Sequence, residues 1–122
     1  MLVAVEWREQ LMTEETAVIA SRVIDELKER LSAAYGDRLH AVVLFGSEAR
    51  GNAGPDSDID VLAVLETLAG DYGEELERGL AAVYPIALQL GRRVSVKPLA
   101  REEYERGDSP LLREVRRSGV AA

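Results

Sequence analysis

Two apolar segments on either side of a polar turn most constrain how this chain can fold. Leu39 to Phe45 is a short, nearly continuous apolar run, as expected of a strand buried on both faces. It ends in Gly46-Ser47, and the connection Asn52–Ser57 consists of turn-forming residues. Ser57 to Leu65 is the second expected strand, with an apolar stretch after a polar start. We therefore expect two strands joined by a Gly-Ser turn and a polar loop.

The second strand begins with two carboxylates. Asp58 and Asp60 are two residues apart, so a strand places them on one face, together with Leu62 and Val64. Two like charges this close are unfavourable where a strand enters a core, and a divalent cation would remove that penalty. The alternative is a solvated acidic turn to which Asp56 simply adds a third charge.

Gly46-Ser47 is the second candidate element. A glycine directly after a strand lets the backbone approach a ligand closely, and successive N–H groups can bind phosphate oxygens. The Ser47 hydroxyl adds a further donor. Taken alone, however, a Gly-Ser pair more often marks an ordinary turn.

Two common motifs are excluded. Val61 stands where an EF-hand loop needs glycine, and Thr67 stands where that loop needs its bidentate glutamate. No lysine follows a glycine near Ser47, so a Walker phosphate loop is also excluded. The single histidine, His40, has no placed partner and is interpreted as structural.

Composition narrows the class of protein. The chain has 122 residues, of which 47% are apolar, which predicts one globular domain over 1–122. It has no cysteine, so disulfides and thiolate metal sites are excluded. The net charge of −7 argues against direct nucleic-acid binding, because a long polyanion would be repelled. A small anion remains possible, since magnesium would supply positive charge locally.

The N-terminal region lacks the pattern of a signal peptide, and no apolar run is long enough to span a membrane. We therefore expect a cytoplasmic protein with no membrane association. Residues 1–12 are interpreted either as a short strand or as a flexible arm.

The remaining pattern predicts three helices and a third strand. The first helix is capped by Thr13, ends near Gly36, and has one apolar face formed by Ile19, Ala20, Val23, Ile24, Leu27 and Leu31. The second is expected over Asp71–Leu90, with Pro85 interrupting it or ending it early, and its inner side is predicted to be Leu76, Leu80, Val83 and Ala87.

The third strand is expected over Val94–Leu99. Ser109-Pro110 then begins a last helix, which contains Leu111, Leu112 and Val115 and stops at Gly119. The resulting order is helix, strand, strand, helix, strand, helix, which predicts a small α/β domain.

The two candidate elements together are more specific than either alone. Gly46-Ser47, residues 48–57, and then Asp58-Ile59-Asp60 resemble the signature of the nucleotidyltransferase superfamily that includes DNA polymerase beta and kanamycin nucleotidyltransferase. With Arg50-Gly51 in the connection, the chain resembles a minimal nucleotidyltransferase, a class usually paired with a HEPN-domain protein. The resemblance implies the nucleotidyltransferase fold, of α/β (α+β) class, in which a short mixed sheet is flanked by helices.

The resemblance also implies roles for single residues. Gly46 and Ser47 would bind the triphosphate tail of ATP. Asp58 and Asp60 would be the catalytic, metal-binding carboxylates and would hold Mg²⁺ or Mn²⁺. Arg50 would reach an oxyanion, or else is a surface arginine. By the same resemblance, the activity is transfer of AMP from ATP to a hydroxyl, including a tyrosine of a HEPN toxin partner, in a hetero-oligomer that makes this chain antitoxin-like.

One departure from the family pattern affects the expected activity. Active members carry a third carboxylate on the next central strand, which here reads Arg93-Val94-Ser95-Val96-Lys97. Ser95 then fills the position of the acid, and Lys97 follows on the same face. The competing hypothesis is therefore a degenerate antitoxin that binds nucleotide and acts by contact alone. A third hypothesis is an aminoglycoside-type nucleotidyltransferase, but no second substrate domain fits within 122 residues.

The last predicted helix offers a candidate docking surface. Arg113, Arg116 and Arg117 cluster positive charge in an acidic chain. They either meet acidic residues of the partner, where charge complementarity would set the rate and register of association, or they are solvated on a helix that closes the sheet.

Overall fold

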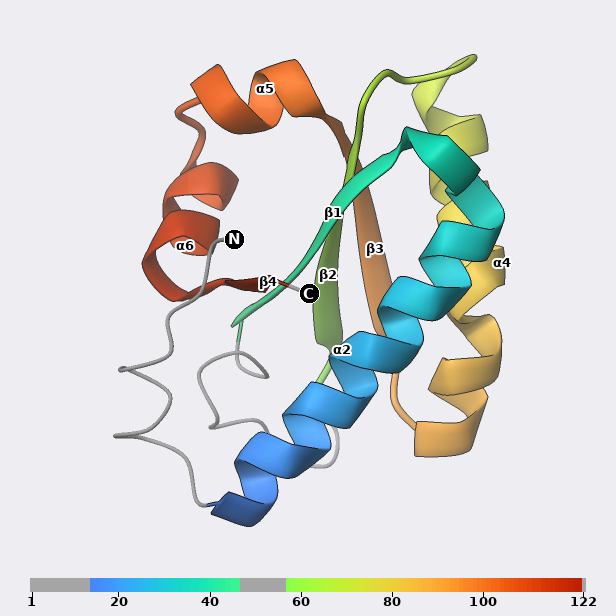
Figure 1. Ribbon diagram of the computed structural model, residues 1–122, viewed down its shortest axis with the longest axis vertical. Helices are drawn as coiled ribbons and strands as arrows, with labels where there is room; N and C mark the ends of the chain where they lie inside the picture. The colour runs from blue at the N-terminus through green and yellow to red at the C-terminus, as the bar shows by residue number, and fades with distance from the viewer. Residues whose placement is uncertain (1–13, 47–56, 122) are drawn as a thin grey trace.

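The computed structural model describes residues 14–46 and 57–121 (Figure 1). The helices are α2 (Glu14–Tyr35), the 3₁₀ turn η1 (Gly36–Arg38), α4 (Tyr72–Leu90), α5 (Arg101–Arg106) and α6 (Pro110–Ser118). The strands are β1 (Leu39–Phe45), β2 (Ile59–Leu65), β3 (Val94–Ala100) and β4 (Val120–Ala121). Within these ranges, no helix is long and apolar enough to cross a membrane.

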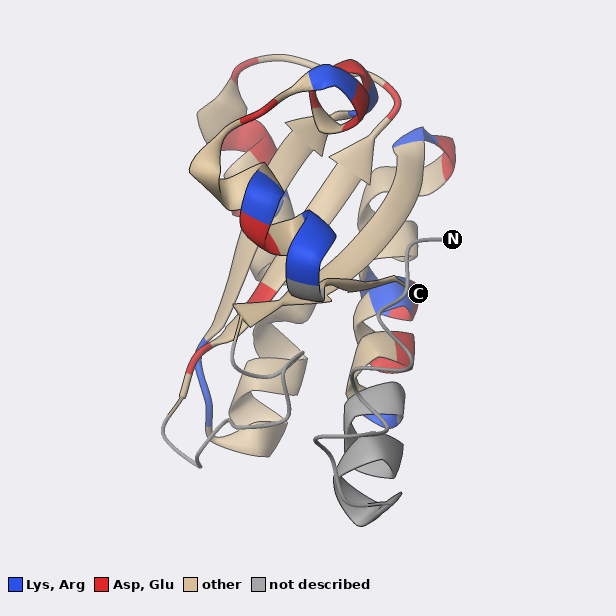
Figure 2. Ribbon diagram, turned by 90° about the vertical axis from the view of Figure 1, so that its left-hand side faces the viewer, with Lys and Arg blue, Asp and Glu red and all other residues tan. Residues whose placement is uncertain are grey.

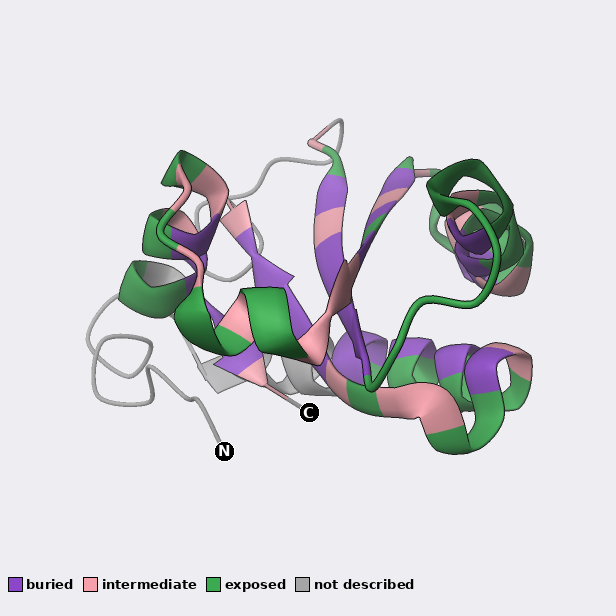
Figure 3. Ribbon diagram, turned by 90° about the horizontal axis from the view of Figure 1, so that it is seen from above, coloured by how far each residue is buried: buried purple, intermediate pink, exposed green. Residues whose placement is uncertain are grey.

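The four strands form one mixed sheet in the order β3-β2-β1-β4. β1 pairs antiparallel with both β2 and β4, whereas β2 and β3 are parallel. Helices α2 and α4 cover one face of the sheet, and α5 and α6 lie on the other (Figures 1 and 3). The mixed sheet flanked by helices confirms the predicted fold class.

Each central strand contributes to two hydrophobic cores because its side chains alternate between the faces. On β2, Val61, Ala63 and Leu65 face the core that contains α2 and α4. Leu62 and Val64 face the smaller core, which is completed by Leu112 and Val115 of α6. The alternation also fixes the side of the sheet on which Asp60 lies, since residues 60, 62 and 64 share a face.

The predicted elements are largely confirmed, with small differences in their ends. β1 has the predicted bounds, whereas β2 begins at Ile59, so that Ser57 and Asp58 precede the strand. α2 ends at Tyr35, and Val23, Ile24, Leu27 and Leu31 are buried as predicted. Thr13 and residues 1–12 lie outside the described residues. The two-residue strand β4 was not predicted, because Val120–Ala121 is too short to give a periodic pattern.

The prediction for α4 needs two corrections. Pro85 neither ends nor breaks the helix, which continues to Leu90. Its cost is limited to one missing N–H and local strain, and the packing of Val83 and Ile86 on either side of it keeps the helix in place. Leu80, predicted to face inward, is 41% exposed.

The position of Gly79 explains why α4 faces the sheet differently from the prediction. A Cβ atom at Gly79 would lie 2.5 Å from the hydroxyl oxygen of Tyr35 and 2.9 Å from Cγ1 of Val96. The helix therefore approaches α2 and β3 at its glycine, and Glu75, Val83 and Ile86 are buried beside it. Sequence periodicity favoured leucines for the inner face and could not show this close approach.

Helix α6 closes the second face of the sheet. Ser109 caps it, since its Oγ accepts a hydrogen bond from the N–H of Leu112 at 3.2 Å. Arg116 donates to the carbonyl oxygen of Gly107 at 2.7 Å and to that of Tyr104 at 3.2 Å. Arg113 and Arg117 form ion pairs with acidic neighbours. The arginines thus have contacts within the chain, and partner docking at this helix stays a prediction.

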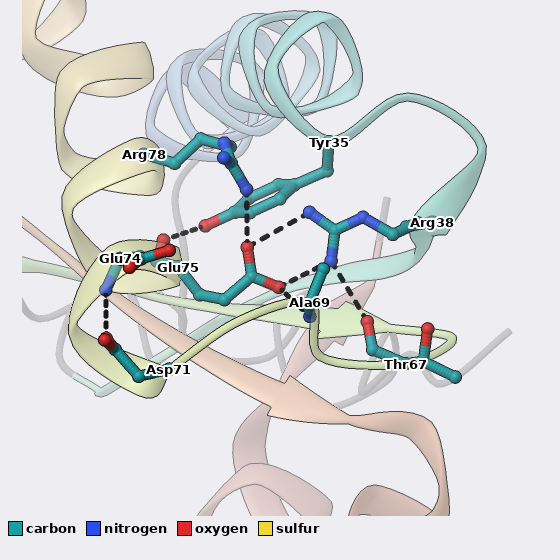
Figure 4. A network of polar contacts seen from close by, with 8 residues as sticks. All are labelled: Tyr35, Arg38, Thr67, Ala69, Asp71, Glu74, Glu75 and Arg78. Carbon is teal, nitrogen blue, oxygen red and sulfur yellow. Dashed lines mark hydrogen bonds and ion pairs between the residues drawn. The ribbon is translucent and has the colours of Figure 1, made fainter.

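A buried carboxylate joins the loops at one end of the sheet (Figure 4). Glu75 is 0% exposed. Arg38 donates to both of its carboxylate oxygens, at 2.5 Å and 3.0 Å, and Arg78 donates to Oε1 at 2.8 Å. The N–H of Ala69 donates to Oε2 at 2.9 Å. The hydroxyl of Tyr35 donates to the backbone carbonyl of Glu75 at 2.6 Å. The network links α2, η1, the loop after β2 and α4.

These contacts set the protonation of both titratable groups. The hydrogen bonds from Arg38 lower the pKa of Glu75 from 4.5 to about 2, against the opposing effect of burial. Burial, together with the negative charge of Glu75, raises the pKa of Tyr35 to about 12. The network is therefore an ionised carboxylate held by two cations beside a neutral tyrosine.

We expect Glu75→Gln to destabilise the protein in a pH-dependent way. A depressed carboxyl pKa stabilises the fold above pH 4.5, and this stabilisation is lost as the pH falls toward 2. At neutral pH the loss should be about 1.5–3 kcal/mol, since charge-assisted hydrogen bonds to a buried carboxylate are lost while Arg38 and Arg78, 26% and 44% exposed, can still be hydrated. The difference from wild type should shrink below pH 4.5. Urea unfolding across this pH range measures it. Glu74→Gln, at an exposed neighbour, is the control, and an equal loss in that variant would contradict the expectation.

Candidate functional site

Two of the predicted site residues, Gly46 and Asp60, meet at one end of the sheet because β1 and β2 are antiparallel. Phe45, the last residue of β1, is the register partner of Asp60, the second residue of β2. Gly46 follows Phe45 directly, so it lies beside Asp60 as well. This is the opposite end of both strands from the Glu75 network, since Arg38 precedes β1 and Thr67 follows β2.

The backbone of Gly46 lies very close to the side chain of Asp60. Its φ of +75° lies in the left-handed region that favours glycine. A Cβ atom built at this position would lie 2.6 Å from Oδ2 of Asp60. Any larger residue would thus be strained in its backbone and would collide with the carboxylate. The backbone of residue 46 can approach the carboxylate of Asp60 this closely only because glycine has no side chain.

Asp58 lies just before β2, at the rim of the site. Its side chain is 46% exposed, and Oδ2 is 3.8 Å from Nη1 of Arg93. The backbone around it is fixed by two hydrogen bonds of 2.9 Å. In one, Nε of Arg92 donates to the carbonyl of Ser57, and in the other the N–H of Ile59 donates to the carbonyl of Arg93. Figure 2 shows acidic and basic residues side by side at this end of the sheet.

Ser95 lies next to Asp60 on the other side. The parallel pairing of β2 and β3 makes Ser95 the register partner of Asp60, and Lys97 the partner of Leu62. Ser95 is half-buried and Lys97 is exposed. Residues 95 and 97 thus share the sheet face of Asp60, as predicted, and neither is an acid.

The donor set suits a divalent cation that is only partly held by protein. Asp58 and Asp60 supply carboxylate oxygens, which hard cations such as Mg²⁺ prefer, and the backbone of Gly46 lies close to one of them. Across residues 14–46 and 57–121, no group of three or more acidic, histidine or cysteine side chains could hold a metal ion. The remaining ligands would have to come from water or substrate. Ser47 and Arg50 lie outside the described residues.

Arg92 and Arg93 are site residues that the sequence reasoning did not single out. They precede β3, and their contacts to Ser57 and Asp58 come from the parallel pairing of β2 with β3. A pair of arginines at the start of a strand is weak evidence on its own. Only the prediction that β3 runs beside β2 in the same direction would have placed them next to the aspartates.

Comparison with known proteins gives partial matches to enzymes that transfer nucleotides. An aminoglycoside nucleotidyltransferase (4') of Staphylococcus aureus is 33% identical over 69 residues, which is 57% of this chain and 26% of that protein. A candidate protein adenylyltransferase of Methanocaldococcus jannaschii is 41% identical over 46 residues, which is 38% of this chain and 46% of that protein. The chain thus spans between a quarter and a half of the length of these relatives.

A solved structure has a similar fold. It is a toxin–antitoxin structure with AMP-PNP, and it matches 80% of this chain and 69% of its own with a TM-score of 0.58 and 18% sequence identity. The family model of the nucleotidyltransferase domain matches residues 21–117, which include β1, β2, β3 and the site they form. The chain therefore belongs to the nucleotidyltransferase domain family.

Proposed function

We propose that this protein is a minimal nucleotidyltransferase that binds ATP with Mg²⁺ or Mn²⁺ and transfers AMP to a hydroxyl group. Family membership supports transfer of a nucleotide. The observation that carries the proposal to this site is the close approach of Gly46 to Asp60, where a glycine with positive φ packs its backbone against a carboxylate. A backbone that can approach so closely, with its N–H groups beside a carboxylate, is what a turn that binds a metal-bound phosphate needs.

The roles follow from the position of each group. Asp58 and Asp60 would hold the cation, which when bound neutralises phosphate charge and orients the triphosphate. Gly46 would let the backbone approach the phosphates, and Ser47 and Arg50 would add donors to them. In the transfer, the acceptor oxygen forms a bond to the α-phosphorus, the bond from that phosphorus to the bridging oxygen breaks, and pyrophosphate leaves. The proton of the acceptor hydroxyl passes to a base.

The proposed acceptor is a tyrosine of a partner protein of the HEPN class. Two observations support a protein acceptor. One relative is a candidate protein adenylyltransferase, and the similar solved structure is a toxin–antitoxin complex. In this role the chain acts as an antitoxin that modifies its toxin within a hetero-oligomer. The match to an aminoglycoside nucleotidyltransferase supports a small-molecule acceptor instead, but it covers only 26% of that enzyme.

The first test concerns metal-dependent nucleotide binding. Calorimetry with AMP-PNP should show binding in Mg²⁺ or Mn²⁺ and at least about tenfold weaker binding in EDTA, which is about 1.4 kcal/mol. Asp58→Asn with Asp60→Asn should remove the dependence on metal, because the carboxylate ligands are lost. Asp37→Asn, an equal change of charge at the opposite end of β1, should leave binding unchanged. Equal affinity with and without metal in wild type would refute the proposal.

A second candidate function is inhibition of the partner by contact alone, with nucleotide bound but not transferred. The register of Ser95 with Asp60 favours it, because an acid at position 95 would lie where it could complete the site. General-base catalysis is typically worth about 10²–10⁴ in rate. A site without that acid should therefore bind nucleotide well and transfer AMP slowly.

Ser95→Asp separates the two candidates. If Ser95 stands in for a missing base, the variant should transfer labelled AMP about 10²–10⁴ times faster than wild type, while Ser95→Ala should change little. Mg²⁺ should also raise the melting temperature more in Ser95→Asp than in wild type, because a third carboxylate beside Asp60 needs the cation to offset repulsion. Rapid transfer by wild type that survives Ser95→Ala would show that the base lies elsewhere.

Gly46→Ala should abolish metal-dependent nucleotide binding. The new Cβ would meet Oδ2 of Asp60 at 2.6 Å, and an L-residue at φ +75° adds about 1–2 kcal/mol of strain. Gly36→Ala is a matched control, since Gly36 also has a positive φ, +62°, but no atom within 4 Å of an added Cβ. Both variants should lose stability from the strained backbone in thermal melts, and Gly46→Ala should lose more, because only its Cβ meets a carboxylate. Nucleotide binding that is retained in Gly46→Ala, or lost equally in Gly36→Ala, would contradict the role of the close approach.

A further inference from the structure

One side of α4 is apolar and exposed to solvent. Leu80, Tyr84 and Leu88, which we call the outer ridge, are 41%, 60% and 64% exposed. They recur every fourth residue and therefore line up along one side of the helix. Five of the six large apolar side chains that are exposed in the described residues belong to α4. The ridge lies outside the contacts that α4 makes with α2 and β3 through its buried side.

The segment that carries the outer ridge has no charge. Residues 79–90 contain no Asp, Glu, Lys or Arg, although 30% of the chain is charged. Figure 2 shows the contrast, because the lower half of α4 is tan while α2 carries both red and blue. Solvent-exposed helix surfaces are normally rich in charge, and the centres of protein interfaces are depleted of it. The ridge therefore has the composition of an interface.

Pro85 adds a hydrogen-bond acceptor to this surface. Proline has no N–H, so the carbonyl of Ala81, one turn earlier, lacks the donor that an interior helical carbonyl normally has. Ala81 and Pro85 are both exposed, and they lie one turn apart on the same side of Tyr84. The surface thus offers a free tyrosine hydroxyl as donor and a backbone carbonyl as acceptor, about one turn apart.

We propose that the occupant of this surface is a second copy of the chain. A ridge of large residues, Leu80, Tyr84 and Leu88, runs beside a row of smaller ones, Ala81 and Pro85, so the ridge of one copy fits the furrow of the other. A two-fold axis near Tyr84 pairs each tyrosine hydroxyl with the Ala81 carbonyl of the other copy, twice. The fit is self-complementary in shape and in hydrogen bonding.

Charge favours a second copy at this place rather than elsewhere on the molecule. Two copies of net charge −7 repel each other, and an uncharged surface is where they meet with the least repulsion. The dimer also leaves the nucleotide site open, because α4 covers one face of the sheet and Asp60 lies on the other. The dimer does not depend on the proposed function.

Sedimentation equilibrium on the full chain tests the proposal. A helix segment about 18 Å long buries less than the about 800 Å² per partner of a standard interface, so we expect dissociation in the micromolar range. Dimer should accumulate between about 5 and 500 µM protein. Tyr84→Glu should raise the dissociation constant at least about tenfold, and Tyr84→Phe should raise it less. Leu68→Glu is the control. It also places a glutamate at an exposed apolar residue, 40% exposed, but outside α4, and it should have no effect on the dissociation constant.

Two further measurements identify the symmetry. Tyr84→Glu mixed with Tyr84→Lys should restore dimer, because a two-fold axis near residue 84 brings the opposite charges together. Since the chain has no cysteine, Ala81→Cys introduces a single thiol. The oxidant diamide should convert two such thiols into one intermolecular disulfide, whereas Ser32→Cys, exposed on α2, should remain monomeric.

Three results would overturn the proposal. The first is a wild-type chain that stays monomeric across the concentration range. The second is dimerisation unaffected by Tyr84→Glu, which would place the interface elsewhere. The third is a monomeric chain that loses binding to a different protein in Tyr84→Glu, which would assign the outer ridge to that partner. Circular dichroism melts of each variant show that it is folded, and the exposed position of residue 84 predicts wild-type stability.

Discussion

The pairing of β2 with both of its neighbours determines the candidate site. Antiparallel pairing with β1 brings Gly46 to Asp60, and parallel pairing with β3 brings Ser95 to Asp60 from the other side. One carboxylate is thus flanked by a glycine, whose backbone approaches it closely, and by a serine that offers no acid. A shift of either register by one residue would separate Asp60 from Gly46 or from Ser95 and disperse the site.

The Glu75 network complements this arrangement at the opposite end of the strands. It joins the residues just before β1, the loop after β2 and the first turn of α4 through one ionised carboxylate. At the site end, the contacts seen among the described residues include those of Arg92 and Arg93 with Ser57 and Asp58. The polar interactions that fix the fold and the groups proposed to bind substrate are therefore spatially separated, so either set can be altered in experiments without disrupting the other.

Local pattern predicted the strands and the face of the sheet that carries Asp60, because alternation along a strand is fixed by covalent geometry. The family motif, together with the order of strands, also predicted that Ser95 lies on the sheet face that carries Asp60. The exposure of Leu80, the continuation of α4 through Pro85 and the burial of Glu75 could not be predicted in this way. Each depends on contacts between residues distant in sequence, such as the approach of Gly79 to Tyr35.

The contact between Gly46 and Asp60 also constrains how this chain can change over time. Part of the cost of a larger residue at position 46 comes from the carboxylate of Asp60 and would disappear if residue 60 were small. The two positions are energetically coupled, so their substitutions should not be additive. A lineage that lost Asp60 would keep only the backbone requirement for glycine, so residue 46 would be less strictly constrained than it is now. Joint replacement of both residues would mark descendants that retain the sheet but lack the proposed cation site.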